Sequence, residues 1–300
     1  MNILKSLGFL PLFLLLNCIA GAQQKPEKEN WIKLFNGKDL TGWDIKIAKH
    51  KLNENFGNTF RVENGIMRLA YDQYKTFDGK YGHMYYKTPF SYYKIRFEYR
   101  FVGNQTPGGD AWNVRNSGIM VHSQSAASMG KLQDFPVSIE IQLLGGLGQG
   151  ERHTANLCTP GTQIEMNGKL VTEHCIDSHS KTYDGDQWVT VEAEVLGDSV
   201  ISHIIAGDTV LQYNKPQVSP DFVGTGYSWE KANVKDADKW KLKAGQLLKE
   251  GYIAVQAESH PIDFRKIELL NLVGCMNKKC KNYKAYYVKQ GKCVCSAGRK

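Results

Sequence analysis

Apolar and polar residues alternate along much of the chain, which is the pattern of β-strands buried on one face only. Turn pairs of the kind that join antiparallel strands, such as Asn64-Gly65 and Gly197-Asp198, separate the alternating runs. A sheet has to bury one face, so many short strands predict an all-β protein of two antiparallel sheets packed face to face. The clearest runs are residues 92–102, 137–143, 188–196, 200–206, 252–257 and 262–270, and the weaker ones are residues 59–62, 66–70 and 118–123.

Helical periodicity is almost absent, and only residues 236–249 predict one short surface helix. Long irregular segments interrupt the strands. Loops of this length inside a compact domain are usually functional, so we expect them to form the rim of a groove. They are residues 72–82, 103–116, 123–135, 145–163 and 216–236.

The N-terminal segment has the composition of a secretory signal. Lys5 precedes an apolar run from Leu7 to Leu16, and Ala20-Gly21-Ala22 offers small residues for cleavage. The run is shorter than the roughly 20 apolar residues that a membrane span needs, and no later segment is long enough either. We therefore predict an exported protein, periplasmic or extracellular. The alternative is a lipoprotein signal acylated at Cys18, although Asn17 is larger than the residue that usually precedes such a cysteine.

These boundaries divide the chain into a signal peptide over residues 1–22, a β-sandwich domain over residues 23–272 and a Cys-rich basic tail over residues 273–300. The formal net charge is +8, with lysines and arginines spread along the chain and densest after Lys278. A nucleic-acid site needs a basic stripe with interleaved stacking aromatics, so this distribution disfavours a nucleic-acid partner. The sequence leaves the oligomeric state open.

Cysteine usage fits an oxidising compartment. Six cysteines remain after removal of Cys18, and their spacing differs from the paired C-x-x-C of a zinc ribbon, so disulfides are favoured over zinc, with a pairing that the sequence does not fix. The tail has too few apolar residues for a core, so covalent links must order it. It either caps the domain, docks on the sandwich, or binds an acidic polysaccharide or cell surface. The six cysteines are Cys158, Cys175, Cys275, Cys280, Cys293 and Cys295.

Four segments carry a resemblance to a known family. The run from Trp31 to Trp43 (WIKLFNGKDLTGW) resembles the start of the 3-keto-disaccharide hydrolase family of exported Bacteroidetes proteins. Residues 116–119 (NSGI), 139–144 (IEIQLL), and 251–256 (GYIAVQ) with 261–267 (PIDFRKI) match in order, so the resemblance covers about residues 31–272. It implies a concanavalin A-like jelly-roll sandwich and a sugar substrate. Two places depart from the family pattern: Val121-His122-Ser123 lacks an arginine, and Glu258-Ser259-His260 replaces an aspartate, histidine and glycine run.

Glu140 is the first candidate for chemistry. In the run 138–143 the period of two puts Ser138, Glu140 and Gln142 on one face and the isoleucines and leucine on the other. The aliphatic side chains belong in the core, so we expect the carboxylate to face the groove where a sugar chain lies. The alternative for Glu140 is a solvated face with a nearby cation.

Further candidates are polar residues on neighbouring strands and loops. His122 is predicted to lie on the same face as Met120, opposite Ile119 and Val121. For each, a purely structural role is the competing interpretation, and Arg265 in particular is expected either to clamp Asp263 or Glu140 or to touch substrate. The remaining candidates are Gln142, Arg115, Arg152, His153, Arg265, Gln256 and His260.

Aromatic residues are plentiful, and rings along loops suit the C–H faces of sugars, although rings are also ordinary core residues. Trp112 and Tyr81 lie in polar, Gly-rich loops, so we predict that both are exposed platforms.

The reaction that the resemblance implies begins from a C3 carbonyl, which acidifies the C2 proton of a sugar. A base removes that proton, the glycosidic oxygen leaves from C1, and water adds back. Glu140 or His122 is the predicted base, and Arg115, Arg152 or Arg265 the electrophile for the enolate oxygen. A divalent metal is the alternative electrophile, with His122, Glu140 and His153 as conceivable ligands; no cofactor is certain.

Two other functions stay open. One is a non-catalytic carbohydrate-binding module of the same fold. The other is a conventional endoglycosidase, which in its retaining form needs two carboxylates about 5 Å apart. Such enzymes usually place both acids on one strand, and Gln142 stands where the second acid belongs. This absence favours the elimination route.

Overall fold

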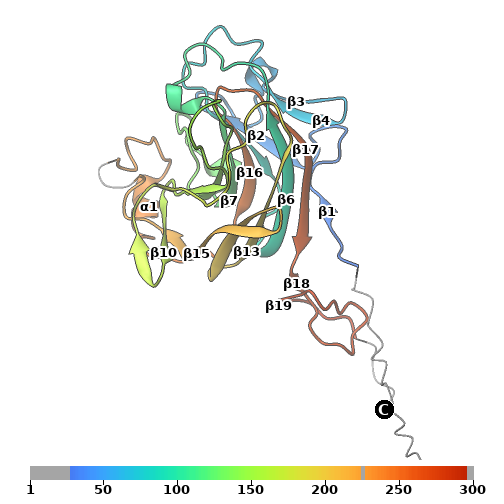
Figure 1. The fold of residues 1–300 in the computed structure, drawn as a ribbon. Coiled ribbons are helices and arrows are strands. Elements are labelled where there is room, and N and C mark those ends of the chain that lie inside the picture. Colours follow the sequence, from blue (N-terminus) through green and yellow to red (C-terminus); the bar gives the residue numbers. More distant parts are fainter. Residues whose placement is uncertain (1–27, 224–226, 296–300) are drawn as a thin grey trace, which may run out of the picture.

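The computed structural model describes residues 28–223 and 227–295, so the predicted signal peptide, with Cys18, lies outside the described residues. Almost all regular structure is β-strand, arranged as two large antiparallel sheets that face each other (Figure 1). This confirms the predicted all-β jelly-roll sandwich. Among the described residues no helix has the length and apolar character needed to cross a bilayer.

The larger sheet has ten strands in the order β11-β10-β15-β14-β13-β6-β17-β4-β3, with β1 paired to β17. Its strands are β1 (Ile32–Lys33), β3 (Phe60–Glu63), β4 (Ile66–Leu69), β6 (Tyr92–Phe101), β10 (Thr162–Met166), β11 (Lys169–Val171), β13 (Val189–Leu196), β14 (Val200–Ile205), β15 (Asp208–Val218) and β17 (Ile262–Asn271).

The smaller sheet has seven strands in the order β12-β9-β8-β7-β16-β5-β2. Its strands are β2 (Trp43–Ile47), β5 (Gly82–Tyr86), β7 (Asn116–Ser123), β8 (Ile139–Leu144), β9 (Asn156–Cys158), β12 (Cys175–Ile176) and β16 (Tyr252–Ala257). In its centre β7 lies between β8 and β16. β16 follows β8 by more than 100 residues in the chain, whereas β7 and β8 are close in sequence.

The core lies between the two sheets and follows from the alternation. In β6 every second residue is buried, and these side chains meet the inward residues of the smaller sheet. From β8 the inward residues are Ile139, Ile141 and Leu143, all fully buried. The other face of β8, which carries Glu140 and Gln142, therefore points out of the sandwich.

Helices are few and short. The predicted surface helix is present as α1 (Ala237–Lys241), shorter than the expected 236–249, and three single 3-10 turns occur in loops. Those turns are η1 (Phe56–Asn58), η2 (Ala111–Asn113) and η3 (Ala126–Ser128). Two of them adjoin the smaller sheet, since η2 contacts its strand β7 and η3 contacts its strands β2 and β5.

The six described cysteines form three disulfides, as predicted, with pairings that the sequence left open: Cys158–Cys175, Cys275–Cys293 and Cys280–Cys295. The first joins β9 to β12 in the smaller sheet, where the two cysteines are direct cross-strand partners. The other two lie in the tail, next to a small pair of parallel strands, β18 (Val273–Gly274) and β19 (Lys289–Gln290).

Candidate active site

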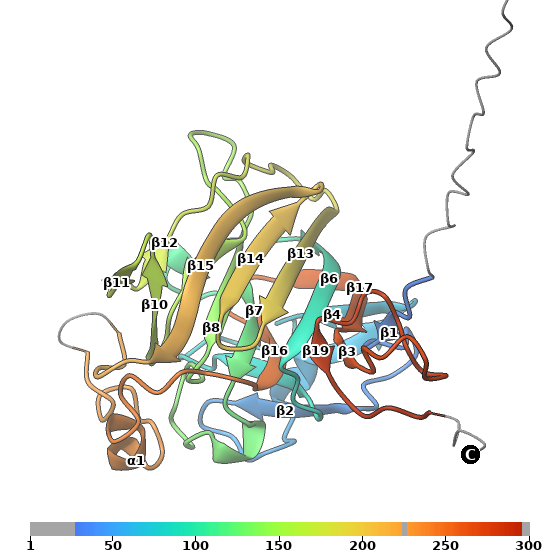
Figure 2. The ribbon, with the colours of Figure 1, turned by 90° about the horizontal axis from the view of Figure 1, so that it is seen from below.

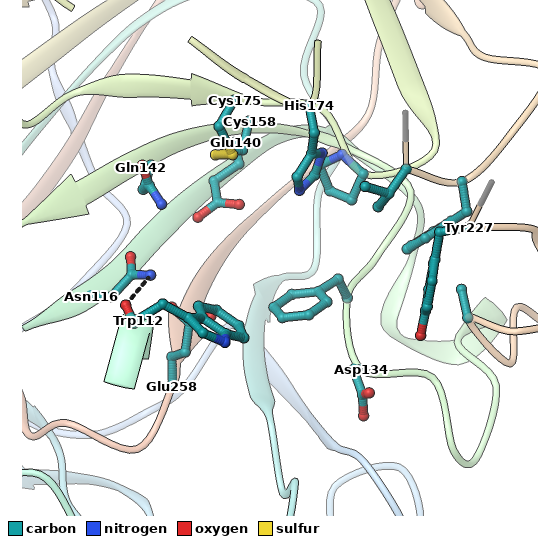
Figure 3. Close-up of a pocket in the computed structure, with 15 residues that line it drawn as sticks. Trp112, Asn116, Asp134, Glu140, Gln142, Cys158, His174, Cys175, Tyr227 and Glu258 are labelled. Atoms are coloured by element: carbon teal, nitrogen blue, oxygen red, sulfur yellow. Dashed lines mark hydrogen bonds between the residues drawn. A yellow bond between two sulfur atoms is a disulfide. The ribbon is translucent and has the colours of Figure 1, made fainter. Parts of the chain in front are cut away.

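A cavity of about 390 Å³ opens on the outer face of the seven-stranded sheet. Its floor comes from β7 and β8, through Asn116, Glu140 and Gln142. One wall is the Cys158–Cys175 disulfide with His174, and Tyr227 lies farther along the cavity, beyond His174 (Figure 3). Phe135 also lines the cavity. The lining is thus largely apolar with a few convergent polar groups, which is typical of a small-ligand site.

Glu140 occupies the position that the alternation predicted. It pairs with Met120 of β7, and its side chain lies across the neighbouring Gly118. A Cβ atom at Gly118 would stand 2.4 Å from Glu140 Oε1 and 2.8 Å from its Cγ. The absence of a side chain at Gly118 therefore makes the room in which the carboxyl group lies, directed from β8 over β7.

Glu258 is a second carboxylic acid in the same cavity (Figure 3). It directly follows β16, the strand on the far side of β7 from β8, and is only 2% exposed. Gln142 does stand at the second position on β8, but a second acid reaches the cavity from beside another strand, so the absence of an acid at Gln142 no longer favours the elimination route. The sequence did contain a signal: Glu258 stands where the family carries an aspartate.

Both carboxyl groups have raised pKa values. Burial raises the pKa of Glu140 to about 8. Burial also raises the pKa of Glu258 well above its usual value, the charge of Glu140 raises it further, and Arg152 acts weakly in the opposite sense. Once Glu140 ionises, its charge holds the proton on Glu258, so the pair offers one basic and one acidic member.

Two amides border the carboxyl pair. The side-chain oxygen of Gln142 accepts a hydrogen bond from Asn156 Nδ2 at 3.3 Å, so its amide nitrogen is the group turned toward the cavity (Figure 3). Asn116 Nδ2 donates to the carbonyl oxygen of Trp112 at 3.2 Å, while its Oδ1 is buried without a hydrogen-bond partner in the described chain. The cavity thus holds a donor and an acceptor for sugar hydroxyl or carbonyl groups.

Trp112 lies at the cavity rim and is 52% exposed, as predicted for a sugar platform. Its ring stacks on Tyr81 with centroids 6.2 Å apart and planes 12° from parallel. The prediction that Tyr81 is also exposed was wrong. Tyr81 is 7% exposed and packs on Phe77 and Phe135, so it supports Trp112 from below.

Asp134 and His174 are further titratable groups of the cavity that the sequence did not single out. Burial raises the pKa of Asp134 to about 6, opposed by the charge of Lys49. Burial lowers the pKa of His174, whose Nδ1 is buried without a hydrogen-bond partner among the described residues. Both were unremarkable in sequence because each lies in an irregular segment or beside a cysteine.

His122 does not join Glu140. Between Ser123 and Met120, β7 holds one residue more than the facing part of β16, and His122 has φ +49°, so a β-bulge breaks the alternation there. Its Nε2 atom lies 2.9 Å from the carbonyl oxygen of Gly197, in the turn between β13 and β14. Burial lowers its pKa to about 4. The structure therefore gives His122 a packing position outside the cavity.

Arg265 is also remote from the cavity. It lies on β17 in the ten-stranded sheet, where its Nε atom is 2.5 Å from Glu98 and its guanidinium covers Trp188. Of the two carboxylates it was expected to clamp, Asp263 is held instead by Arg68 and Arg100, and Glu140 lies in the other sheet.

Arg115, Arg152 and His153 bind the loops beside the cavity and are not among its lining residues. Arg115 contacts Asp186 and the carbonyl oxygen of Gly185. Arg152 donates to the carbonyl oxygen of Gly145 at 2.7 Å, although its charge reaches Glu258. His153 Nδ1 contacts the carbonyl oxygen of Ser180.

Gln256 and His260 flank Glu258 in the chain and are almost fully buried. Neither side-chain polar atom of Gln256, and neither ring nitrogen of His260, has a hydrogen-bond partner in the described residues. Burial lowers the pKa of His260 to about 4, and the charge of Arg115 acts in the same sense. Neither is among the residues that line the cavity.

The conceivable metal ligands do not come together, since His122 and His153 contact the carbonyl oxygens of Gly197 and Ser180 and do not line the cavity that holds Glu140. In the described chain, the His, Cys and acidic groups close enough to share an ion are Cys158 with His174 and Cys175, and Cys275 with Cys280 and Cys293. All five cysteines are in disulfides, so their sulfurs are not available as thiolates. No cofactor is established, and no step below passes through one.

A jelly-roll sandwich with two carboxyl groups, two amides and an exposed tryptophan in one cavity belongs to the class of carbohydrate-acting or carbohydrate-binding proteins. Comparison of sequences makes this more specific. Residues 30–270 match the family described as the 3-keto-alpha-glucoside-1,2-lyase-like domain, and the chain belongs to that family. No curated protein sequence matches the chain significantly.

Two solved structures are similar to this chain over most of its length. A putative glycosyl hydrolase from Parabacteroides distasonis is 16% identical, with a TM-score of 0.45 over 80% of this chain and 93% of that chain. The carbohydrate-binding module CBM66 from Bacillus subtilis is 8% identical, with a TM-score of 0.37 over 82% of this chain and 99% of that chain.

The carboxyl pair has a consequence for stability. A buried acid whose pKa is raised binds a proton in the native state that the unfolded chain has released, so stability falls as pH rises through the native pKa. The buried histidines His83, His122, His203 and His260, whose pKa values are lowered to about 3 or 4, act oppositely, but only up to pH 6.5. Between pH 6.5 and 8 the carboxyl pair therefore dominates.

We expect the free energy of unfolding to decrease across this window, by at most about 1.4 kcal/mol per pH unit for each retained proton. Urea titrations at intervals of half a pH unit measure it. The double variant Glu140→Gln, Glu258→Gln should give a flatter profile. A wild-type profile that rises from pH 6.5 to 8 would contradict the raised pKa values.

Proposed function

We propose that this protein cleaves 3-keto glycosides by elimination at the glycosidic bond, followed by addition of water. The observation that carries the proposal is the buried pair of Glu140 and Glu258, which provides one base and one acid in the same cavity. The exposed ring of Trp112 lies at the rim of that cavity. The family to which the chain belongs supports the choice of a 3-keto substrate.

The first step breaks the C2–H bond. Glu140 ionises before Glu258, so its carboxylate takes the C2 proton and the electron pair moves into the enolate of the C3 carbonyl. The amide nitrogen of Gln142 is the donor available for the enolate oxygen. This replaces the arginines that the sequence suggested, since none of them lines the cavity.

The second step breaks the C1–O bond. The enolate collapses to a C1=C2 double bond, and the departing glycosidic oxygen takes the proton of Glu258. Water then adds: ionised Glu258 accepts a proton from water as the hydroxyl bonds to C1, and protonated Glu140 returns a proton to C2. The sum is hydrolysis, with both carboxyl groups restored to their starting states.

The competing function is that of a conventional glycoside hydrolase, and Glu258 is the observation that favours it. Two carboxylic acids in one cavity also satisfy a direct mechanism at C1, in which the C2–H bond stays intact. A 3-keto disaccharide incubated in heavy water distinguishes the two reactions. In elimination the C2 proton passes to the Glu140 carboxyl group, which exchanges it with heavy water while the leaving sugar is replaced by water, so one deuterium enters at C2 of the released sugar. Direct hydrolysis places none there.

Mass spectrometry of early product gives the readout, with the free 3-keto sugar in heavy water as a control for spontaneous exchange. We expect cleavage of the 3-keto disaccharide with one deuterium at C2 and no cleavage of the unoxidised sugar. Cleavage of the unoxidised disaccharide without C2 label would assign the conventional reaction. Binding of either sugar with no cleavage would assign a carbohydrate-binding module.

We also propose that the protein acts outside the cytoplasm. Three disulfides in the described chain support this, because such bonds form and persist in oxidising compartments.

A further inference from the structure

The tail forms a small covalently closed unit, which we call the C-terminal knuckle and define as residues 273–295. Its two disulfides and the parallel pair β18-β19 tie both ends of the segment together. The knuckle adjoins the sandwich where Val288 and Lys289 donate backbone hydrogen bonds to the carbonyl oxygen of Leu272. Its shape is therefore set by links that do not depend on a large apolar core.

The knuckle carries most of the net charge of the protein. Residues 274–295 contain six lysines and no acidic residue, whereas the whole chain has a net charge of +8. Five of these lysines are exposed, and none of the five makes an ion pair with a carboxylate of the described residues. They are Lys278, Lys279, Lys281, Lys289 and Lys292.

On the sandwich, many positive charges are paired with negative ones. Several basic residues on its ten-stranded sheet pair with acids, as Arg68 and Arg100 do with Asp263 and Lys266 with Glu98. Like charges held close together repel each other, and an opposite charge from outside relieves that repulsion. The knuckle is thus the part of the described chain where we expect an anionic partner to have the most favourable electrostatic interaction.

The knuckle lies far from the cavity. Tyr227 of the cavity wall precedes α1 by ten residues, and in both ribbon views α1 lies at one end of the molecule while β19 lies at the other (Figures 1 and 2). A partner held by the knuckle leaves the cavity open. Such an arrangement suits a polymer that the knuckle binds while the cavity stays open, either to another part of the same polymer or to a sugar near it.

We propose that the C-terminal knuckle binds an acidic polysaccharide, a polymer of uronic acid type, through these five lysines. Partly exposed Tyr283 and Tyr287 in the same segment offer ring faces for the C–H surfaces of sugars. A membrane is the weaker match, because three exposed apolar side chains, Met276, Val288 and Val294, fall short of the apolar face with which amphipathic helices insert. The inference does not depend on the reaction in the cavity.

Affinity electrophoresis of the chain from residue 23 onward, in gels containing polygalacturonate, neutral dextran or no polymer, tests this. The variant replaces all five lysines by glutamine. The matched control replaces five exposed lysines of the sandwich, Lys33, Lys38, Lys51, Lys75 and Lys169, and so loses the same charge. Circular dichroism melts of each variant verify that the sandwich is folded.

We expect retardation by polygalacturonate and not by dextran, with affinity weakened about tenfold or more in the knuckle variant, because several weak exposed ion pairs are lost together. The affinity of the control variant should change by less than about twofold. Salt near 0.5 M should abolish binding, since the attraction between exposed charges is then screened within a few ångströms. Glu140→Gln should bind as wild type, which separates this result from the cavity. Absence of retardation, equal weakening in both lysine variants, or binding to anionic phospholipid vesicles alone would overturn the proposal.

Discussion

Replacing Glu140 with glutamine is expected to lower kcat for cleavage of a 3-keto disaccharide by about 10³-fold, within the range that general acid–base catalysis contributes. Glutamine keeps the size of the side chain and its place over Gly118 but accepts no proton. Glu258→Gln should cost a similar factor because the leaving oxygen then receives no proton. Initial rates over a range of substrate concentrations separate kcat from KM, and KM should change by less than about fivefold.

The pH profile adds a second signature. Because the pKa of Glu140 is near 8, wild-type kcat should rise toward pH 8 as the base ionises. Glu192→Gln is the control; this residue lies on β13 in the other sheet and should keep wild-type rates. Turnover by Glu140→Gln within tenfold of wild type would remove this carboxylate from the mechanism.

Replacing Gly118 with alanine is expected to lower kcat by about 10²-fold while the protein stays folded, because displacement of a catalytic group by about 1 Å has an effect of this size. The new methyl group would stand 2.4 Å from Glu140 Oε1 and 2.8 Å from Cγ, so the carboxyl group has to swing away. The backbone accepts alanine, since Gly118 is not among the residues with positive φ. A steady-state assay and a thermal melt measure the two effects.

Gly168→Ala is the matched control. Gly168 lies in the turn between β10 and β11 at φ +74°, and a Cβ there meets nothing within 4 Å. We expect it to lose about 1 kcal/mol of stability from backbone strain and none of its activity. Equal loss of kcat in the two variants would show that Gly118 acts through general stability and not through the position of Glu140.

The fold was predictable where one face of a strand is polar and solvent-exposed and the other face is apolar and buried. The run 252–257 is β16 to the residue, and 92–102 is β6 with one residue fewer. β5 escaped prediction because His83, Met84 and Tyr85 are all buried, so its two faces do not differ in polarity. Short pairs such as β9 with β12 are held by a disulfide, and the sequence alone does not show which cysteines meet.

For the site, the sequence predicted which face of a strand a residue occupies, but not which strands lie next to one another. Alternation placed Glu140 on the outer face, but Glu258 meets it only because β7 lies between β8 and β16, an order set by long-range pairing. His122 was assigned to the wrong face because one extra residue in β7 reverses the alternation at its end. Arg265 sits on an equally regular strand, yet in the other sheet, which periodicity does not distinguish.

The disulfide between Cys158 and Cys175 is also a part of the cavity wall, beside His174. Formation of this bond therefore completes one side of the cavity, because it holds β12, and with it the segment that carries His174, against β9. A chain whose Cys158 and Cys175 are reduced lacks this covalent support of the cavity wall.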